Sequence, residues 1–295
     1  MREMQRAETR NIEQGPEVSN LFGMQRTNAC DGIYAQYIKN ASANNGRIIP
    51  VSSVLEEVVD FCKQNLDVNV EAREYLFKQR RLSEEIAEQF KIGYCPSDLS
   101  ALYKRVNPQK LREIGFIRDA ESSQFPSRII FPVWNQYGEL VAIAGRILPK
   151  YFTGVRKYYN TLYAKSRILF GMNFALEKIK ETSEALVTEG HLDVITSHEF
   201  GLTNVVGTCG TAFTFEHMML LSRYAKRIRL LFDADEAGMK ATKRVLGTEY
   251  PGVEVDSVSI SKNEDLDSYL RKRGVDALKV LLHDDPLQKI RTRLI

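Results

Sequence analysis

The sequence predicts an α/β fold in which a mostly parallel sheet is flanked by helices and preceded by a mixed α+β subdomain of basic character. From about residue 184, short apolar segments alternate with helical segments, which is the pattern of βα units in a parallel sheet. Upstream, helical segments and a β-hairpin occupy a stretch rich in lysine and arginine. A chain of 295 residues with 43% hydrophobic content can bury a core of this size.

This organisation divides the chain into consecutive parts. Residues 1–50 are polar and rich in Gln, Asn and Ser, so we expect a flexible leader. Residues 51–182 form the basic N-terminal subdomain, residues 183–275 the α/β domain, and residues 276–295 a C-terminal tail. No segment reaches the roughly 18 apolar residues that span a bilayer, and the N-terminus lacks the apolar stretch of a secretory signal. We therefore expect a cytoplasmic protein without a membrane partner.

Apolar residues at helical spacing open the basic subdomain. Residues 54–62 follow this spacing and predict a helix, and residues 72–77 and 82–90 predict two shorter ones. A β-hairpin follows, with strands over residues 127–134 and 139–146 joined by a turn at residues 135–138. The hairpin places Arg128 and Arg146 near its outer ends.

The chain is locally basic around and after this hairpin. The net charge of the whole chain is only +3, but residues 123–182 hold nine Lys or Arg against three acidic residues. Within this stretch, residues 151–160 combine aromatic and basic side chains. Such a segment is typical of a solvated face with aromatic core residues, and equally of a surface that stacks bases and neutralises phosphates. The residues alone leave both interpretations open.

The α/β domain is predicted from four strand and helix pairs. The strands lie at residues 185–189, 203–207, 227–233 and 253–259, and the helices begin near Leu192, Phe215, Glu236 and Asp265. The glycine-containing segment 207–211 stands at the second strand-to-helix junction. Its backbone N–H groups suit a phosphate, although such glycines more often form a tight turn.

Carboxylates stand where these strands end. Glu189 ends the first strand, and Asp233 and Asp235 end the third. The carboxyl ends of neighbouring parallel strands meet at one edge of a sheet, so we expect these side chains to converge. Like charges about 4 Å apart repel by several kcal/mol at intermediate dielectric, and a divalent cation relieves that repulsion. Oxygen ligands suit Mg²⁺ or Mn²⁺, and Mg²⁺ commonly also binds substrate phosphates.

Simpler interpretations exist for several of these residues. Asp233 and Asp235 would also serve as caps for the following helix. Asp265 and Asp267, after the last strand, either cap a helix or complete the metal site. His191 lies two residues from Glu189, where a packing or surface role is expected. The four cysteines form no Cys-x-x-Cys pair and the histidines show no ligand spacing, so no zinc is predicted.

These motifs together resemble the Toprim domain shared by DnaG-type primases, topoisomerases and several nucleases. The Toprim signature is Glu-Gly at one strand end and Asp-x-Asp at another, here Glu189-Gly190 and Asp233-Ala-Asp235. Residues 75–94 are similar to the helical entry of the primase RNA-polymerase core. Four further motifs of this chain are similar in order and character to the basic half of that core: Phe131-Pro132-Val133, Gly145-Arg146, Lys157-Tyr158-Tyr159-Asn160 and Leu169-Phe170-Gly171. The resemblance covers roughly residues 55 to 285.

The resemblance implies a primase core that joins ribonucleoside triphosphates on a single-stranded DNA template with Mg²⁺ or Mn²⁺. It implies Glu189, Asp233 and Asp235 as the catalytic and metal-binding acids, with Asp265 and Asp267 as a second acidic pair. A role of Glu189 as general base stays open beside metal coordination. Together with Arg128 of the hairpin, the residues expected to bind template or nucleotide are Arg146, Lys157, Tyr158, Asn160 and Lys165.

The chain also departs from the family pattern. A typical primase begins with a zinc ribbon and carries a helical subdomain after Toprim and a C-terminal helicase-binding domain, and none of these is evident here. We therefore expect either a fragment or a divergent phage or plasmid primase. Its expected partners include a replicative helicase and a separate zinc-bearing module. The alternatives are a Toprim nuclease and a non-catalytic protein that binds single-stranded nucleic acid.

Overall fold

The computed structural model describes residues 51–118, 123–233, 236–248, 250, 252–260 and 264–283. The chain is divided after residue 48, and all of the described residues belong to the second unit, Ile49–Ile295. The predicted leader over residues 1–50, the Asp235 carboxylate and the chain after residue 283 lie outside the described residues. Within the described ranges, no helix is both long and apolar enough to cross a membrane.

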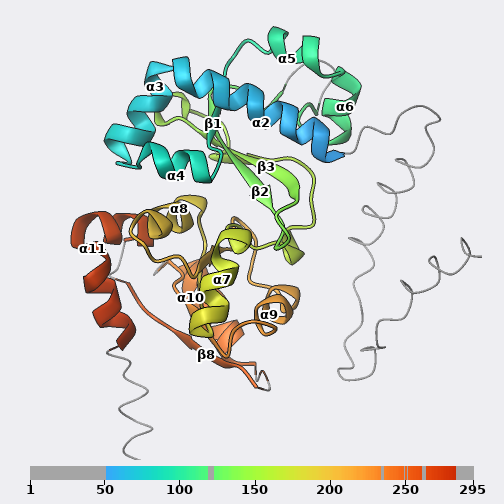
Figure 1. Cartoon of the computed structure of the whole chain (residues 1–295). Helices are drawn as coiled ribbons and strands as arrows, with labels where there is room; N and C mark the ends of the chain where they lie inside the picture. The colour runs from blue at the N-terminus through green and yellow to red at the C-terminus, as the bar shows by residue number, and fades with distance from the viewer. Residues whose placement is uncertain are drawn as a thin grey trace, which may run out of the picture. The chain divides into compact units, whose positions relative to one another are not determined.

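The N-terminal part of the second unit is a four-stranded antiparallel sheet accompanied by helices (Figure 1). Its strands pair in chain order and are β1 (Gly93–Cys95), β2 (Arg128–Trp134), β3 (Leu140–Ile147) and β4 (Tyr158–Asn160). Its helices are α2 (Val51–Val68), α3 (Val70–Arg73), α4 (Glu84–Gln89), α5 (Ser100–Arg105) and α6 (Pro108–Glu113). Short 3-10 turns lie at Pro149–Tyr151 and Lys165–Arg167.

The predicted hairpin and the three predicted helices are present, with one difference in the second helix. There α3 is followed by a π-helical turn over Glu74–Gln79, which the backbone N–H of Arg80 closes on the carbonyl of Tyr75 at 2.9 Å. A π-turn of this kind inserts one extra residue into a helix, which apolar spacing does not reveal. Arg80 follows this turn, and its guanidinium pairs with the carboxylate of Asp267.

Strand β2 is buried along its whole length because both of its faces are covered. Ile130 and Trp134 belong to a core shared with α2 residues such as Val58. Ile129 and Phe131 point the other way, into a core that includes Leu192 and Val194 of the α/β domain. This alternation follows from the two-residue repeat of a strand. The sheet therefore packs on α2 with one face and toward the α/β domain with the other.

The α/β domain contains a four-stranded parallel sheet with strand order β6-β5-β7-β8, which confirms the predicted fold class. The strands are β5 (Glu184–Thr188), β6 (Val205–Gly207), β7 (Arg227–Leu230) and β8 (Glu254–Ser257). The helices are α7 (Met172–Thr182), α8 (His191–Glu199), α9 (Phe215–Leu221), α10 (Glu236–Leu246) and α11 (Leu266–His283). Each helix of the βα units begins close to its predicted start.

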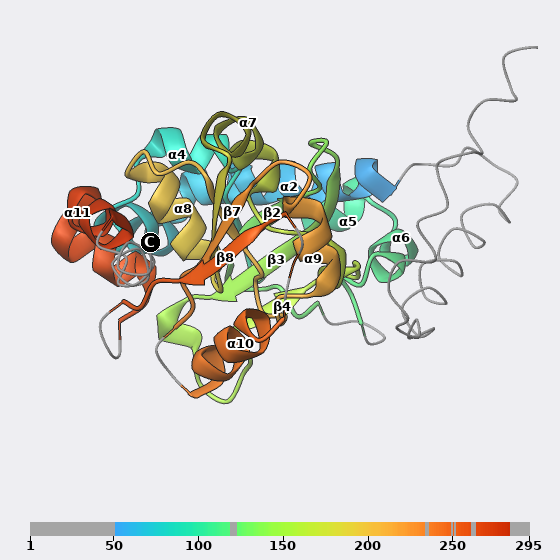
Figure 2. The ribbon, with the colours of Figure 1, turned by 90° about the horizontal axis from the view of Figure 1, so that it is seen from below.

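Helices cover both faces of this sheet (Figure 2). Ala185 and Val187 of β5 share a core with α7, α9 and α10, whereas Leu186 shares the other core with α8 and α11. Helix α11 continues to His283 and so includes the first residues of the predicted tail, residues 276–295. Its helical geometry is interrupted at Gly274, with φ of 77°, so the chain changes direction there and then forms further helix.

Candidate active site

A cavity of about 380 Å³ lies between the antiparallel sheet and the carboxyl edge of the parallel sheet. One side of its lining is basic and polar, and comes from the N-terminal subdomain: Arg80, Arg146, Lys157, Tyr158, Asn160 and Lys165. The other side is acidic, and comes from the α/β domain: Glu189, Asp193, Asp233, Asp265 and Asp267. The structure thus brings the predicted basic residues other than Arg128 to the same cavity as the predicted acids that it describes.

Glu189 and Asp233 converge beside the start of α10. Glu189 follows the last residue of β5, and Asp233 lies between β7 and α10. A Cβ atom at Gly238 would stand 2.1 Å from the carbonyl oxygen of Asp233 and 3.0 Å from Oε1 of Glu189. Real Cβ atoms essentially never come within 3.0 Å of another heavy atom, so a side chain at this position would displace Asp233. The glycine allows the helix to pack directly against both acidic positions.

Asp193 is a site residue that our sequence reasoning missed. It lies in the first turn of α8, with 7% of its surface exposed. Its Oδ2 accepts a hydrogen bond from the backbone N–H of Gly190 at 3.0 Å, and its Oδ1 accepts one from the backbone N–H of Asp267 at 3.0 Å. The available signal was an acid three residues after a strand-end glycine, the spacing of a helix capping box.

Burial raises the pKa of Asp193 to about 7, and the negative charges of Asp265, Asp233 and Asp267 add to this shift. The shift reflects burial first and the neighbouring carboxylates second. All of these donors are oxygen atoms, the type that Mg²⁺ and Mn²⁺ prefer. The residues present therefore fit a divalent cation in both charge and donor chemistry. Among the described residues, no three such side chains are already arranged around one point, and Asp235 is not among them.

Asp265 and Asp267 differ in their surroundings. Asp265 accepts a hydrogen bond from the backbone N–H of Ser268 at 2.8 Å and caps α11. Burial opposes its ionisation, but the hydrogen bonds from Ser268 and the positive charges of Arg80 and Lys157 outweigh burial, so its pKa lies below the usual value. Asp265 is thus an ionised carboxylate at the cavity, as a metal ligand must be.

Asp267, predicted as a metal ligand, lines the cavity, but its carboxylate is engaged by neighbouring side chains. Asp267 is 1% exposed, and its Oδ2 is paired with the guanidinium of Arg80. Its Oδ1 accepts hydrogen bonds from Arg271 and from the hydroxyl of Thr196. A carboxylate held by two arginines has little capacity left for a cation. Asp267 instead joins the N-terminal subdomain to the α/β domain through Arg80.

The structure corrects the prediction for Arg128. Arg128 is 2% exposed and does not belong to the lining of the cavity. Its guanidinium donates to the backbone carbonyl oxygens of Gln124, Arg156 and Lys157, at 2.7, 2.9 and 3.1 Å. The position at the start of a strand that suggested an exposed cation is covered by the returning β3–β4 loop. Arg128 therefore supports the backbone that carries Lys157.

The basic side of the cavity is fixed by pairing between β3 and β4. Arg146 and Tyr158 are partners in the register of these strands, and Arg146 donates to the Tyr158 hydroxyl at 2.8 Å. Burial lowers the pKa of Lys157, and the nearby charge of Arg146 lowers it further. Burial likewise lowers the pKa of Lys165. Crowded, partly desolvated cations of this kind favour an anionic ligand.

His191 connects the two sides of the cavity. It is the first residue of α8, directly after Glu189-Gly190, and its ring stacks on Tyr158 at 5.2 Å and on Phe131 at 5.5 Å between centroids. Burial lowers its pKa to about 3, and the charges of Lys165 and Arg146 act in the same direction, so the ring is neutral. The expected packing role agrees with this arrangement. The stack sets the spacing between the Glu189 turn and β4.

Comparison with known proteins agrees with this architecture. Residues 61–176 match the family model for the N-terminal domain of the DNA primase catalytic core, and residues 186–270 match the Toprim-like model. A DNA primase of Haemophilus influenzae is 32% identical over 238 residues, which cover 75% of this chain and 40% of the relative. The chain thus spans less than half the length of that relative.

Solved structures show the same similarity. The RNA polymerase domain of the Mycobacterium tuberculosis primase DnaG superposes with a TM-score of 0.72 at 27% identity, covering 83% of this chain and 86% of that domain. A DnaG primase catalytic domain solved bound to single-stranded DNA superposes with a TM-score of 0.71 at 27% identity, covering 79% of this chain and 78% of that one.

Proposed function

Because this chain belongs to the family of DnaG-type primase catalytic cores, we propose that it joins ribonucleoside triphosphates into short RNA primers on a single-stranded DNA template. The observation that carries the proposal is the cavity with one basic and one acidic side. Phosphoryl transfer between nucleotides needs cations that hold phosphates and carboxylates that hold metal ions, facing each other across the reacting atoms.

In the proposed reaction, the 3′ hydroxyl of one nucleotide attacks the α-phosphate of the next, and pyrophosphate leaves. Arg146, Lys157 and Lys165 bind and orient the phosphates of the template strand or the incoming nucleotide. Tyr158 keeps Arg146 in place through its hydroxyl, and Asn160 offers a polar side chain beside it. These groups act mainly by positioning and by neutralising charge.

We propose that Glu189, Asp233, Asp235 and Asp265 hold Mg²⁺ or Mn²⁺. When bound, the metal would stabilise negative charge on the attacking and leaving oxygens. Asp193 positions the acidic side by holding the Gly190 and Asp267 backbones. A second role for Glu189, accepting the proton of the attacking hydroxyl, uses the same position and stays open. A replicative helicase and a separate zinc-bearing module remain predicted partners.

The proposal is tested with end-labelled single-stranded DNA, incubated with Mg²⁺ in the presence and absence of ribonucleoside triphosphates. A primase core leaves the DNA intact and makes oligoribonucleotides only when triphosphates are present. A Toprim nuclease shortens the labelled DNA without triphosphates, and that result would overturn the proposal. Asp233→Asn is the matched variant, because it removes one charge from the acidic side while keeping the size of the side chain.

A further inference from the structure

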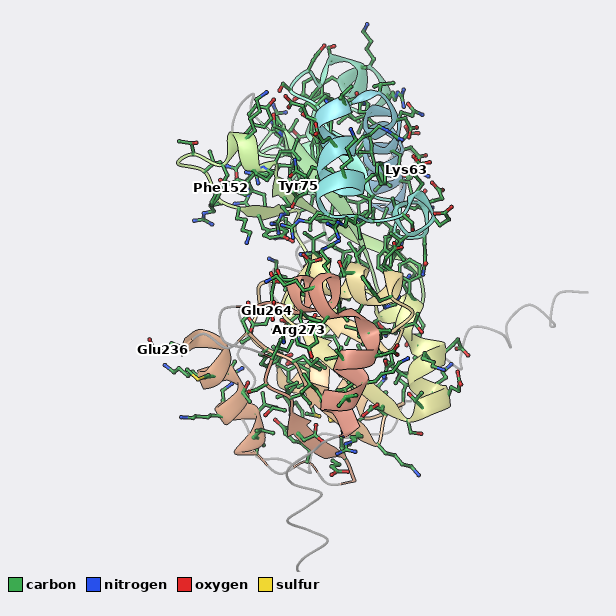
Figure 3. The ribbon with its side chains drawn as sticks, turned by 90° about the vertical axis from the view of Figure 1, so that its left-hand side faces the viewer. Lys63, Tyr75, Phe152, Glu236, Glu264 and Arg273 are labelled. Atoms are coloured by element: carbon green, nitrogen blue, oxygen red, sulfur yellow. The ribbon has the colours of Figure 1, made fainter. Side chains whose placement is uncertain are left out.

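The loop that connects β3 to β4, residues 148–157, carries exposed apolar side chains and leads to the cavity. Phe152 is 54% exposed and Val155 is 44% exposed. In Figure 3, Phe152 lies at the outer edge of the N-terminal subdomain. The same loop ends at Lys157, which lines the cavity. A partner that covered this phenylalanine, five residues from a cavity lysine, would gain from its burial.

One end of this loop is attached to α3. The hydroxyl of Tyr151 donates to Oε2 of Glu71 at 2.8 Å, and the ammonium of Lys150 pairs with Oε1 of the same carboxylate. The backbone N–H of Phe152 donates to the carbonyl of Pro149 at 3.2 Å, which completes the 3-10 turn below it. The Tyr151 side chain is thus held by a hydrogen bond to Glu71, whereas the side chain of the following residue, Phe152, is exposed.

The other end of the loop is attached to the sheet through Arg128. The guanidinium of Arg128 donates to the carbonyl oxygens of Arg156 and Lys157, and its carbon lies 4.6 Å from the centre of the Tyr159 ring. The backbone N–H of Ile147 donates to the carbonyl of Lys157 at 3.0 Å and closes the loop. Both ends are therefore fixed, so an occupant of the Phe152 surface does not have to order the ends of the loop first.

The charge around this surface selects the occupant. From residue 140 to residue 176 the chain contains no Asp or Glu, and Arg156 and Lys157 follow Phe152 in the loop. Lys150 is neutralised locally by Glu71. An aromatic ring followed by two cations, in a loop whose nearby acid Glu71 is paired with Lys150, matches a nucleobase with its phosphate rather than an apolar protein surface.

We propose that Phe152 stacks on a base of single-stranded nucleic acid whose phosphates contact Arg156 and Lys157 as the strand passes to or from the cavity. Arg128 and Glu71 are positioning residues for this contact, since they hold the two ends of the loop. This inference rests on the proposed function, because it assigns a binding surface for the strand that the same cavity uses.

The test measures binding of a fluorescently labelled single-stranded oligonucleotide by anisotropy, with the full chain and without metal or triphosphates. Phe152→Ala should weaken binding by about fivefold or more, which corresponds to about 1 kcal/mol, the lower end of base–aromatic stacking. Phe152→Trp should preserve binding. Tyr137→Ala is the matched control, because Tyr137 is also an exposed aromatic residue, 72% exposed, in the turn at the opposite end of β3.

The Phe152→Trp variant also reports stacking directly. The only tryptophan of the natural chain, Trp134, is buried, so a change in emission on binding comes from position 152. An oligonucleotide with bases should quench this emission, whereas an abasic strand of equal charge should not. Lys157→Ala should reduce the salt dependence of binding, and Phe152→Ala should leave that dependence unchanged, since only the lysine carries charge.

The outcomes separate the two proposals. If the wild-type chain binds single-stranded DNA and Phe152→Ala binds it equally well, the stacking inference is wrong and the proposed function stands. The same conclusion follows if the abasic strand quenches the emission of the Phe152→Trp variant as strongly as the normal strand does. If the wild-type chain binds no single-stranded DNA under any salt condition, both the inference and the proposed function are overturned.

Discussion

The carboxylate of Asp193 accepts a hydrogen bond from the backbone N–H of Asp267 at 3.0 Å, across 74 positions of the chain. Its other oxygen holds the backbone N–H of Gly190. One side chain therefore connects the turn that carries Glu189 with the first turn of α11, which follows Asp265. The relative positions of these proposed metal ligands depend on Asp193, even if it never contacts the metal.

Asp193→Ala should release both backbone N–H groups. We expect faster hydrogen exchange at the amides of Gly190 and Asp267, and a loss of primer synthesis of about 100-fold, because small displacements of catalytic groups cost about that much. The side chain of the Asp193→Asn variant can accept one of the two hydrogen bonds, so its amide exchange rates and its primer synthesis should lie between those of wild type and of the alanine variant. Unchanged exchange at both amides in the alanine variant would show that the contact does not hold these segments.

The pair of Arg80 and Asp267 should contribute to stability rather than to metal binding. Asp267→Ala leaves Arg80 and Arg271 without their buried partner, and we expect a decrease of about 3 kcal/mol in the free energy of unfolding. Urea denaturation without metal measures this. Glu177→Ala is the control, since its pair with Lys180 is exposed and should cost less than about 1 kcal/mol. An Asp267→Ala variant as stable as wild type would restore Asp267 as a candidate ligand.

Gly238→Ala should inactivate the protein although alanine favours helix. The added Cβ would lie 2.1 Å from the Asp233 carbonyl oxygen, so the Asp233 backbone must move, and synthesis should fall by about 100-fold. Gly138→Ala is the control: its φ of +81° disfavours alanine, unlike the helical Gly238, but no atom lies within 4 Å and it is in the β2–β3 turn. Full activity of Gly238→Ala would contradict the placement of Asp233 beside α10.

Buried neutral histidines should make the protein less stable in mild acid. Burial lowers the pKa of His198 and of His217. In the His217 ring, Nδ1 accepts a hydrogen bond from the backbone N–H of Thr214, and Nε2 donates one to the carbonyl oxygen of Lys165 at 2.9 Å. Below about pH 6.5 the unfolded chain therefore binds protons that the folded chain does not, and the unfolding free energy falls as pH falls, by at most about 1.4 kcal/mol per pH unit for each histidine.

Asp193 changes the unfolding free energy in the opposite direction. Its pKa is raised in the folded chain, so the folded chain binds a proton before the unfolded chain does, and this contribution stabilises the fold as pH falls. The histidine contribution is therefore read from the difference between wild type and His217→Asn, measured by urea denaturation from about pH 7 to about pH 5. The variant should lose less stability over this range than wild type. Equal losses in the two proteins would indicate that His217 is already protonated in the folded state.

Much of this arrangement could be predicted from sequence because it depends on local patterns. The alternation of apolar strands and helices after residue 184 defined the parallel sheet, and the position of Glu189 and Asp233 at strand ends defined where they meet. The hairpin followed from alternating residues and a glycine turn. Such signals are carried by neighbouring residues, so they can be recognised without knowledge of the tertiary contacts.

The contacts of Arg128 and Asp267 that sequence reasoning did not reveal join distant segments of the chain. Arg128 has the composition of a surface cation, but the β3–β4 loop returns over it and uses its guanidinium as a backbone donor. Asp267 has the spacing of a ligand pair with Asp265, but its carboxylate is bonded to the guanidinium of Arg80. Arg80 follows the π-turn and lies 187 positions away in the chain. Neither partner is visible from local spacing.

The most direct test of the central claim is incorporation of labelled ribonucleotides on a single-stranded DNA template with Mg²⁺ or Mn²⁺, comparing wild type with Glu189→Gln. The account predicts oligoribonucleotides that require template and metal for wild type, and none for Glu189→Gln with its fold and single-stranded DNA binding retained. Equal synthesis by the two proteins would contradict the proposed active site. Binding of single-stranded DNA by wild type without synthesis under any of these conditions would contradict a self-sufficient primase core.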